Sequence, residues 1–215
     1  MPIIVPSILE TTKSEFLNTL SKEVKLPGVN RIQIDFADGV FVPNKLVDIS
    51  EVDSLSPAFH FEAHLMVNAP KDFVDYKISG FRTIILHFEA YKTTNELLLA
   101  LKDIKEHGME AGLCIKVETP VSVLKQFEGI VNNFQIMSVH PGFQGTVFIE
   151  QTYERIKELR LLLPNAIIEV DGGINRENIK KVFEVGANIA IAGSVITKDS
   201  NMQEAWEHLK QIIQE

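Results

Sequence analysis

The chain has 215 residues, of which 45% are hydrophobic and 23% charged, and its formal net charge is -8 at pH 7. A chain of this length and composition folds as one globular domain or at most two. The acidic balance argues against nucleic acid or an anionic membrane as a partner. No apolar run approaches the ~20 residues that a membrane span needs. The single cysteine excludes an intramolecular disulfide and is compatible with a cytoplasmic protein.

Short apolar runs alternate with amphipathic segments along the chain. Eight runs are predicted as strands, at residues 3–6, 31–35, 60–65, 83–87, 111–117, 134–139, 167–170 and 189–192. Apolar residues spaced by three and four predict helices between them, among them 12–24, 94–107, 150–162, 176–185 and 202–214. Such alternation implies parallel strands with crossover helices. At about 27 residues per unit, the eight units predict a compact (β/α)8 TIM barrel, with residues 1–215 as a single domain.

Two predicted strands end in an aspartate. In residues 31–37, alternation places Gln33 and Asp35 on the face opposite the isoleucines, and Asp171 ends a second apolar strand. The C-terminal ends of barrel strands form the active-site face of such folds. A carboxylate buried there costs free energy unless it is paired, bound to a ligand or used in chemistry. Each acid alone is equally well explained as a hydrogen-bonded loop residue, but the pair predicts one site.

Three glycine-containing segments come late in the chain, at residues 141–145 (PGFQG), 171–173 (DGG) and 192–194 (AGS). Glycine lets the backbone approach a ligand closely and point its N–H groups at an anion. The loops after strands seven and eight are the common phosphate site of barrels. Tight turns would explain each segment by itself, whereas the positions of two of the three favour a phosphate site.

Six segments resemble, in order, the signature segments of the ribulose-phosphate 3-epimerase family. They are residues 6–9 (PSIL), 35–44 (DFADGVFVPN), 64–67 (HLMV), 137–143 (MSVHPGF), 168–173 (IEVDGG) and 192–194 (AGS). The resemblance implies a barrel of the ribulose-phosphate-binding type. It also implies a cytoplasmic isomerase of carbohydrate metabolism, in the pentose phosphate pathway, that acts at C3 of ribulose 5-phosphate or a related small ketose phosphate. A homo-oligomer without nucleic acid or membrane partners is implied as well.

The resemblance assigns roles to residues of this chain. Asp35 and Asp171 become the two catalytic acid/base residues, on opposite faces of the sugar, and Asp35, His64 and Asp171 become metal ligands. The implied substrate contacts are Ser7, His64, Met66, Met137, Gly142, Phe143, Gln144, Gly145, Gly172, Gly173, Gly193 and Ser194. Two carboxyl groups suit this chemistry, because a base must remove the C3 proton on one face and an acid must return one on the other.

The chain departs from the family pattern at the site. The histidine expected two residues before the first catalytic aspartate, a fourth metal ligand in the family, is Gln33, and an expected methionine is Ala37. A glutamine amide oxygen is a weak, neutral ligand. We therefore expect a divalent cation (Zn, Fe, Mn or Co) to bind weakly or not at all. Lys116 and His140 are candidates to supply positive charge near the intermediate instead.

Two other functions stay open. Gln33 and Ala37 favour a sugar-phosphate-binding or regulatory homologue that has lost the reaction. The two acids and His64 favour the epimerase, because a pure binder has little need for two facing buried carboxyls. A keto-sugar-phosphate decarboxylase on the same barrel is a third interpretation. Lys116 leaves it open, although the DxKxxD-type spacing is not seen.

Overall fold

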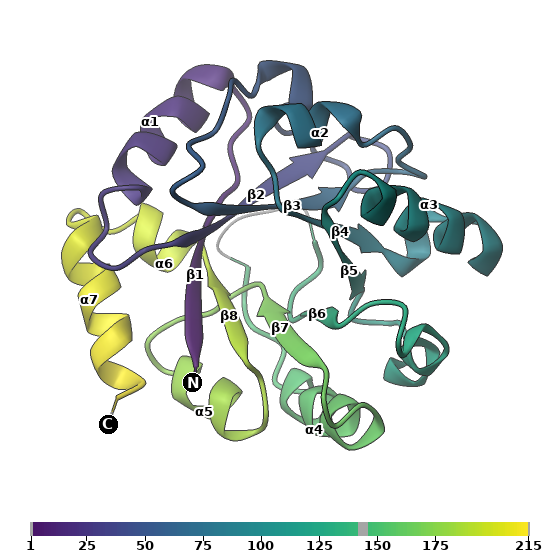
Figure 1. Ribbon diagram of the computed structural model, residues 1–215. Coiled ribbons are helices and arrows are strands. Elements are labelled where there is room, and N and C mark those ends of the chain that lie inside the picture. Colours follow the sequence, from purple (N-terminus) through teal and green to yellow (C-terminus); the bar gives the residue numbers. More distant parts are fainter. Residues whose placement is uncertain (1, 142–145, 215) are drawn as a thin grey trace.

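The computed structural model describes residues 2–141 and 146–214. Eight parallel strands form a closed barrel in chain order, and β8 pairs with β1 to close it. Figure 1 shows the strands at the centre and the helices around them. The strands are β1 (Ile3–Ile8), β2 (Arg31–Ala37), β3 (His60–Met66), β4 (Thr83–His87), β5 (Glu110–Ile115), β6 (Asn133–Met137), β7 (Ile167–Asp171) and β8 (Ile189–Ala192). The predicted (β/α)8 barrel is therefore confirmed.

The helices differ more from the prediction than the strands do. The α-helices are α1 (Lys13–Glu23), α2 (Val74–Ser79), α3 (Thr94–Glu106), α4 (Thr152–Leu162), α5 (Ile179–Glu184), α6 (Ser194–Thr197) and α7 (Met202–Ile212). Three 3₁₀ helices in the described residues are η1 (Ile49–Glu51), η2 (Phe88–Ala90) and η3 (Val121–Phe127). The helix predicted at 176–185 begins only at Ile179, because the Asn175 side chain accepts the N–H groups of Glu177 and Asn178 and forms a turn there.

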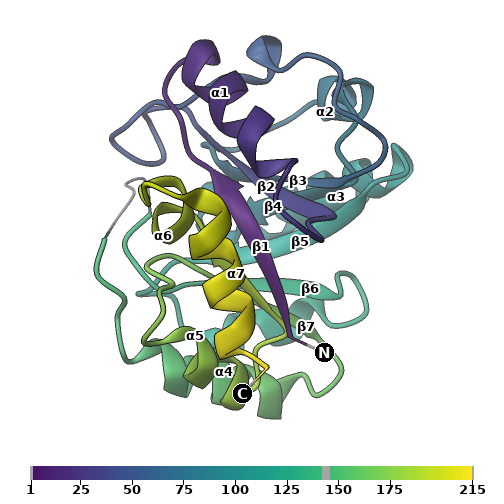
Figure 2. The same cartoon turned by 90° about the vertical axis from the view of Figure 1, so that its left-hand side faces the viewer.

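The main apolar core lies between the sheet and the surrounding helices. Figure 2 shows these helices and strands from a second side. Ile32, Ile34 and Phe36 of β2 are at most 2% exposed and belong to this core. Gln33 and Asp35 alternate with them and face the barrel interior, where Gln33 reaches Asp171 on β7. Alternation along one strand thus separates the packing residues from the polar ones.

The barrel interior also holds a buried charged cluster at the level where β2 begins. Arg31 Nε donates to Glu62 at 2.6 Å, and its Nη2 donates to Glu169 at 2.6 Å. Burial raises the pKa of Glu62 to about 8, and the charge of Glu169 adds to the rise while Arg31 opposes it. One guanidinium therefore links two buried carboxyl groups that belong to strands far apart in the sequence.

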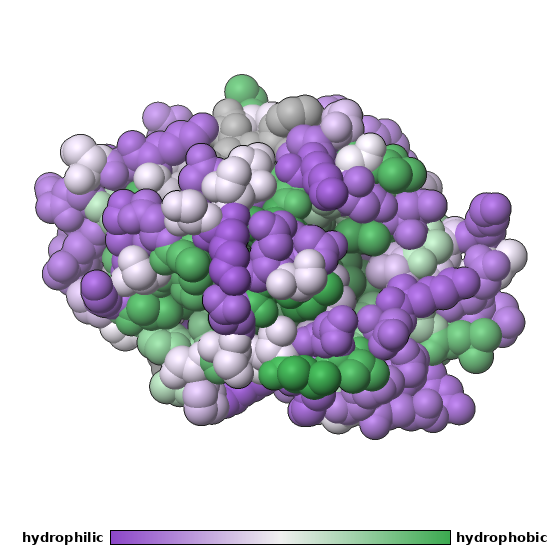
Figure 3. Space-filling view, turned by 90° about the horizontal axis from the view of Figure 1, so that it is seen from above, coloured by the Kyte–Doolittle hydropathy of each residue, from purple (hydrophilic) through white to green (hydrophobic). Residues whose placement is uncertain are grey.

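The face of the molecule seen from above is mostly polar (Figure 3). Hydrophilic side chains cover much of the face in Figure 3, and the apolar ones form smaller groups among them. Within the described parts of the chain, no helix combines the length and apolarity needed to cross a bilayer.

Candidate active site

Asp35 and Asp171 lie close together inside the barrel, although β2 and β7 are not neighbours. Gln33 Nε2 donates to Asp35 Oδ1 at 2.9 Å and to Asp171 Oδ2 at 2.8 Å. His64 Nδ1 lies 2.9 Å from Asp35 Oδ1 and 3.2 Å from Asp171 Oδ2. Gln135 Nε2 also donates to Asp171 Oδ2, at 3.1 Å. The two acids therefore share Gln33 and His64 as hydrogen-bond partners, and Asp171 has Gln135 in addition.

Burial sets the protonation of this group. It raises the pKa of Asp35 to about 6, an effect that hydrogen bonds from His64 and Gln33 oppose and the charge of Asp171 reinforces. For His64, burial is the largest effect and lowers the pKa, but hydrogen bonds to Asp171 and Asp35 outweigh it and leave the pKa well above its usual value. Asp35 is thus placed to exchange a proton near neutral pH.

The acid pair opens onto a cavity. Ser7, Asp35, Asp171 and Gly193 line a small space of about 50 Å³. This space and a larger one of about 670 Å³, which Lys181 and Lys198 also line, share the residues Thr146, Gly173, Ile174 and Ser194. A cavity lined by two lysines and by two acids, Glu150 and Glu177, therefore adjoins the carboxyl groups.

The backbone after β7 packs so closely against Val139 and Phe148 that both of its first two positions require glycine. Gly172 has φ +111°, and a Cβ there would lie 2.4 Å from Cγ2 of Val139. Gly173 has φ +63°, and its Cβ would lie 2.8 Å from the Phe148 nitrogen. Side chains are disfavoured at both positions. The remaining predicted substrate contacts, Gly142, Phe143, Gln144 and Gly145, lie outside the described residues.

The two methionines predicted to contact substrate lie at strand ends inside the barrel. Met66 and Met137 are 2% and 3% exposed and are aligned with Ala37 and Asp171 on the neighbouring strands. Residues aligned in this way on neighbouring strands point to the same face of a sheet, so both methionines share the inward face.

The two basic candidates have partners of their own. Lys116 is partly buried, and its Nζ lies 3.6 Å from the centre of the Phe41 ring and 3.5 Å from the Phe41 carbonyl oxygen. His140 is largely exposed, and its Nδ1 lies 2.8 Å from a Glu118 carboxyl oxygen. Lys116 thus packs against the loop after β2, and His140 pairs with Glu118 at the surface.

The comparisons with known proteins agree with this architecture. The model of the "Ribulose-phosphate 3 epimerase family" matches residues 3–197. The chain belongs to this family. A chloroplastic ribulose-5-phosphate-3-epimerase of Arabidopsis thaliana is 35% identical, over 97% of this chain and 76% of that protein. The ribulose-phosphate 3-epimerase of Bacillus subtilis is 31% identical, over 96% of this chain and 97% of the relative.

Solved structures of low sequence identity share the fold of this family member. KGPDC from Streptococcus mutans matches with a TM-score of 0.73 at 17% identity, over 100% of this chain and 98% of that one. A 3-hexulose-6-phosphate synthase matches with a TM-score of 0.68 at 15% identity, over 99% and 100% of the two chains. At these identities the match shows the fold alone.

The donor set of this family member fits a divalent cation. Asp35, His64 and Asp171 can each offer one ligand atom, and these atoms lie within 4.8 Å of one another. Gln33 Oε1 is buried and has no hydrogen-bond partner among the described residues. If the Gln33 amide rotated by about 180°, its oxygen would face the Asp35 and Asp171 carboxylates in place of its nitrogen. That orientation is favourable only when a cation lies between the amide oxygen and the carboxylates. Gln33 can therefore serve either as a donor to the acids or as a fourth, weak ligand.

Several site residues escaped the sequence argument. Gln135 lies two residues before Met137 on β6, as Gln33 lies two before Asp35 on β2, so inward alternation could have identified it. Lys181 and Lys198 lie in and just after helices that follow β7 and β8, where a lysine carries no particular signal. Cys114, from whose sequence context no site role was predicted, is fully buried beside His64 and His87.

Proposed function

We propose that this member of the family is an isomerase that epimerises C3 of a small ketose phosphate, interconverting ribulose 5-phosphate and xylulose 5-phosphate or a closely related pair. The observation that carries the proposal is the acid pair, Asp35 and Asp171, which Gln33 and His64 bridge beside a polar cavity. The relatives' names support the same substrate class.

In the proposed reaction, one aspartate removes the C3 proton and the other returns a proton to the opposite face of the enediolate. Asp35 is suited to be the base near neutral pH, since burial raises its pKa to about 6. His64 Nδ1 holds the two carboxyl groups in register and stabilises negative charge on them. Asp35, His64 and Asp171, with Gln33 as a weak fourth donor, would hold a divalent cation, which would supply charge stabilisation for the enediolate oxygen.

The phosphate would bind in the neighbouring cavity. Gly172, Gly173, Gly193 and Ser194 line the two adjoining spaces. Lys181 and Lys198 supply positive charge there, beside Glu150 and Glu177. Ser7, Met66 and Met137 would contact the sugar. The predicted loop contacts Gly142, Phe143, Gln144 and Gly145 remain part of the proposal.

The setting of the reaction is part of the same proposal. We infer a cytoplasmic enzyme with one domain over residues 1–215, acting as a homo-oligomer without nucleic acid or membrane partners. A single buried cysteine suits a reducing compartment.

A catalytically impaired sugar-phosphate binder is the second candidate. The Gln33 amide nitrogen between the two carboxylates favours it, because a donor in that position competes with a metal ion.

Solvent exchange separates the two candidates. The purified protein is incubated with ribulose 5-phosphate in deuterated water, with a chelator or with added Zn, Fe, Mn or Co, and C3 is followed by NMR. Deuterium at C3 together with xylulose 5-phosphate supports the epimerase. Binding of the sugar phosphate without exchange at C3, under every metal condition, refutes it and supports the binder.

A further inference from the structure

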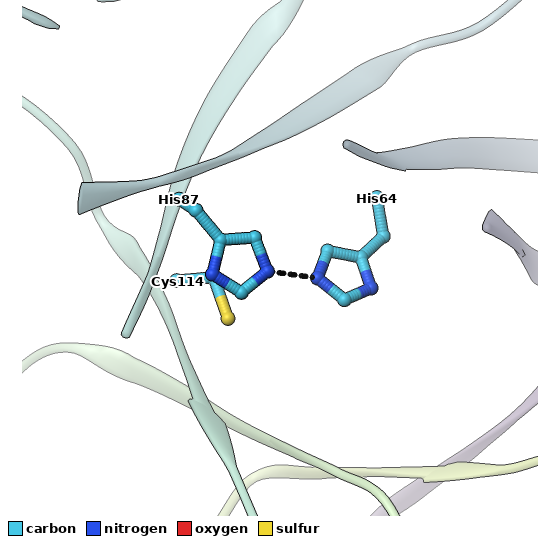
Figure 4. Close-up of side chains that lie close together, drawn as sticks. All are labelled: His64, His87 and Cys114. Atoms are coloured by element: carbon cyan, nitrogen blue, oxygen red, sulfur yellow. Dashed lines mark hydrogen bonds between the residues drawn. The ribbon is translucent and has the colours of Figure 1, made fainter. Parts of the chain in front are cut away.

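A second group of buried donors shares His64 with the acid pair and adds two residues that the proposed epimerisation does not use. It consists of His64 on β3, His87 on β4 and Cys114 on β5, which Figure 4 shows with the two rings facing one another. The three side chains are at most 1% exposed. His64 Nε2 lies 2.8 Å from His87 Nε2, and one ligand atom from each residue lies within 4.8 Å of the others.

The ring contacts require a proton or a metal ion between the two histidines. His64 Nδ1 faces Asp35 at 2.9 Å, and His87 Nδ1 faces Glu89 Oε2 at 3.5 Å. A carboxylate attracts an N–H group and repels a lone pair, which favours a hydrogen on the Nδ1 of His64. Burial lowers the pKa of His64, but hydrogen bonds to the acids outweigh it and hold this pKa well above its usual value, so the ring also carries a proton on Nε2. In the metal-free protein this proton lies between the two Nε2 atoms, which are 2.8 Å apart, and a metal ion bound to both nitrogens would displace it.

We propose that this protein binds a thiophilic transition-metal ion, Zn²⁺ foremost, through His64 Nε2, His87 Nε2 and Cys114 Sγ. Tetrahedral zinc has Zn–N bonds of about 2.0–2.1 Å and Zn–S bonds of about 2.3 Å, which place two ligating nitrogens about 3.3 Å apart. The rings would therefore separate by about half an ångström, a rotamer-scale adjustment. A ligating histidine whose other nitrogen faces a carboxylate is the usual arrangement around zinc.

The surroundings of the third donor favour a soft metal ion over a hard one. Ile85, Met137 and Val139 pack against Cys114 in one buried apolar cluster, so the sulfur is not surrounded by oxygen ligands. Thiolate and imidazole together select zinc and similar ions, whereas Mg²⁺ and Ca²⁺ require oxygen. Binding displaces the thiol proton, and the charge of the metal ion compensates the burial of the thiolate.

This site is distinct from the carboxylate site and does not rest on the proposed function. An ion at His64 Nε2 keeps Nδ1 as an N–H donor to Asp35 and Asp171, so His64 is then not a ligand in the carboxylate site. The two sites would consequently compete for one imidazole. The apolar walls and the sulfur donor distinguish the new site chemically from the oxygen-rich one.

Cobalt titration tests the proposal directly. Because Cys114 is the only cysteine in the sequence, a thiolate-to-cobalt charge-transfer band can arise from it alone. Metal-depleted, reduced full-length protein is titrated with Co²⁺ and no other ligand. We expect a near-ultraviolet charge-transfer band that saturates at one equivalent and disappears when Zn²⁺ is added. Saturating Co²⁺ without this band would overturn the proposal and leave a shared proton between the rings.

Variants assign the ligands. Cys114→Ser and His87→Gln are expected to lose the band, whereas Asp171→Asn, in the carboxylate site, keeps it. Glu89→Gln removes the carboxylate behind His87 and should weaken Co²⁺ binding about 10–100-fold. A band that persists in His87→Gln would refute the assignment of that ligand and with it the site.

A measurement on the unaltered protein guards against variants that fail to fold. X-ray absorption of the protein loaded with one equivalent of Zn²⁺ should show a sulfur scatterer at about 2.3 Å. Nitrogen and oxygen neighbours without sulfur would overturn the proposal.

Discussion

Replacing Gln33 with methionine should move the acid limb of the pH–rate profile to higher pH. The change keeps a side chain of similar length but removes the amide that donates to Asp35 Oδ1 at 2.9 Å. A hydrogen bond to a charged group stabilises that group by about 1.5–3 kcal/mol, and one pKa unit corresponds to about 1.4 kcal/mol. The pKa of Asp35, about 6 in the intact protein, should therefore rise by about one to two units in Gln33→Met.

The consequence for the rate follows from the ionised fraction of the base. If the pKa rises to about 7.5, ionised Asp35 falls about fourfold at pH 7 and recovers by about pH 9. We expect the acid limb of the pH profile of kcat/KM to move to higher pH by about the same one to two units as the pKa of Asp35. The profile is measured by C3 exchange in the presence of a chelator.

Gln135→Met is the matched control. Gln135 donates to Asp171 Oδ2 at 3.1 Å rather than to Asp35, so its loss should move the Asp35 limb much less. An acid limb that stays in place in Gln33→Met, or shifts equally in both variants, would show that the Gln33 amide does not set the pKa of Asp35. A loss of activity that high pH does not restore would also contradict this role.

Three further predictions concern the acid pair, the charged cluster and the phosphate cavity. Asp171→Asn should lower epimerisation about 10²–10⁴-fold in the NMR assay while sugar-phosphate binding persists, and near-normal turnover would contradict the two-acid mechanism. Because burial raises the pKa of Glu62 to about 8, its contribution to stability is complete below about pH 4.5 and is lost as pH rises through 8. Glu62→Gln should thus gain stability relative to the unaltered protein between about pH 5 and pH 9 in urea unfolding, and a constant difference would refute this. Gly173→Ala, at φ +63° with its Cβ 2.8 Å from the Phe148 nitrogen, should cost about 1–3 kcal/mol of stability and raise KM; an unchanged urea midpoint would show that the loop adapts freely.

The barrel and the positions of the two acids were within reach of the sequence. Period-two alternation in β2 requires Gln33 and Asp35 to share a face, and parallel strands place their C-terminal ends at one mouth. The residue at which α5 begins could not be predicted from the sequence, because the hydrogen bonds of Asn175 form a local turn that competes with the helix.

Contacts across the barrel interior could not be predicted. The approach of His64 to His87 depends on the stagger of neighbouring strands, which no sequence pattern states. The direction of Lys116 was equally open, since an inward lysine and one packed on an aromatic ring have the same local sequence. The structure resolves this through the ring of Phe41, a residue far away in the chain.

The alternation along β2 has an evolutionary consequence. Ile32, Ile34 and Phe36 supply packing to the shell between sheet and helices, while Gln33 and Asp35 supply chemistry to the interior. The interior has only small apolar clusters beside its polar side chains, so the hydrophobic stabilisation of the molecule rests mainly on the larger core of the shell. Substitutions at the odd-numbered positions of β2 can therefore change the chemistry of the interior, while the residues at the even-numbered positions maintain the packing of the barrel. Position 33, where the family resemblance leads us to expect histidine and this chain has glutamine, is one of these odd-numbered positions.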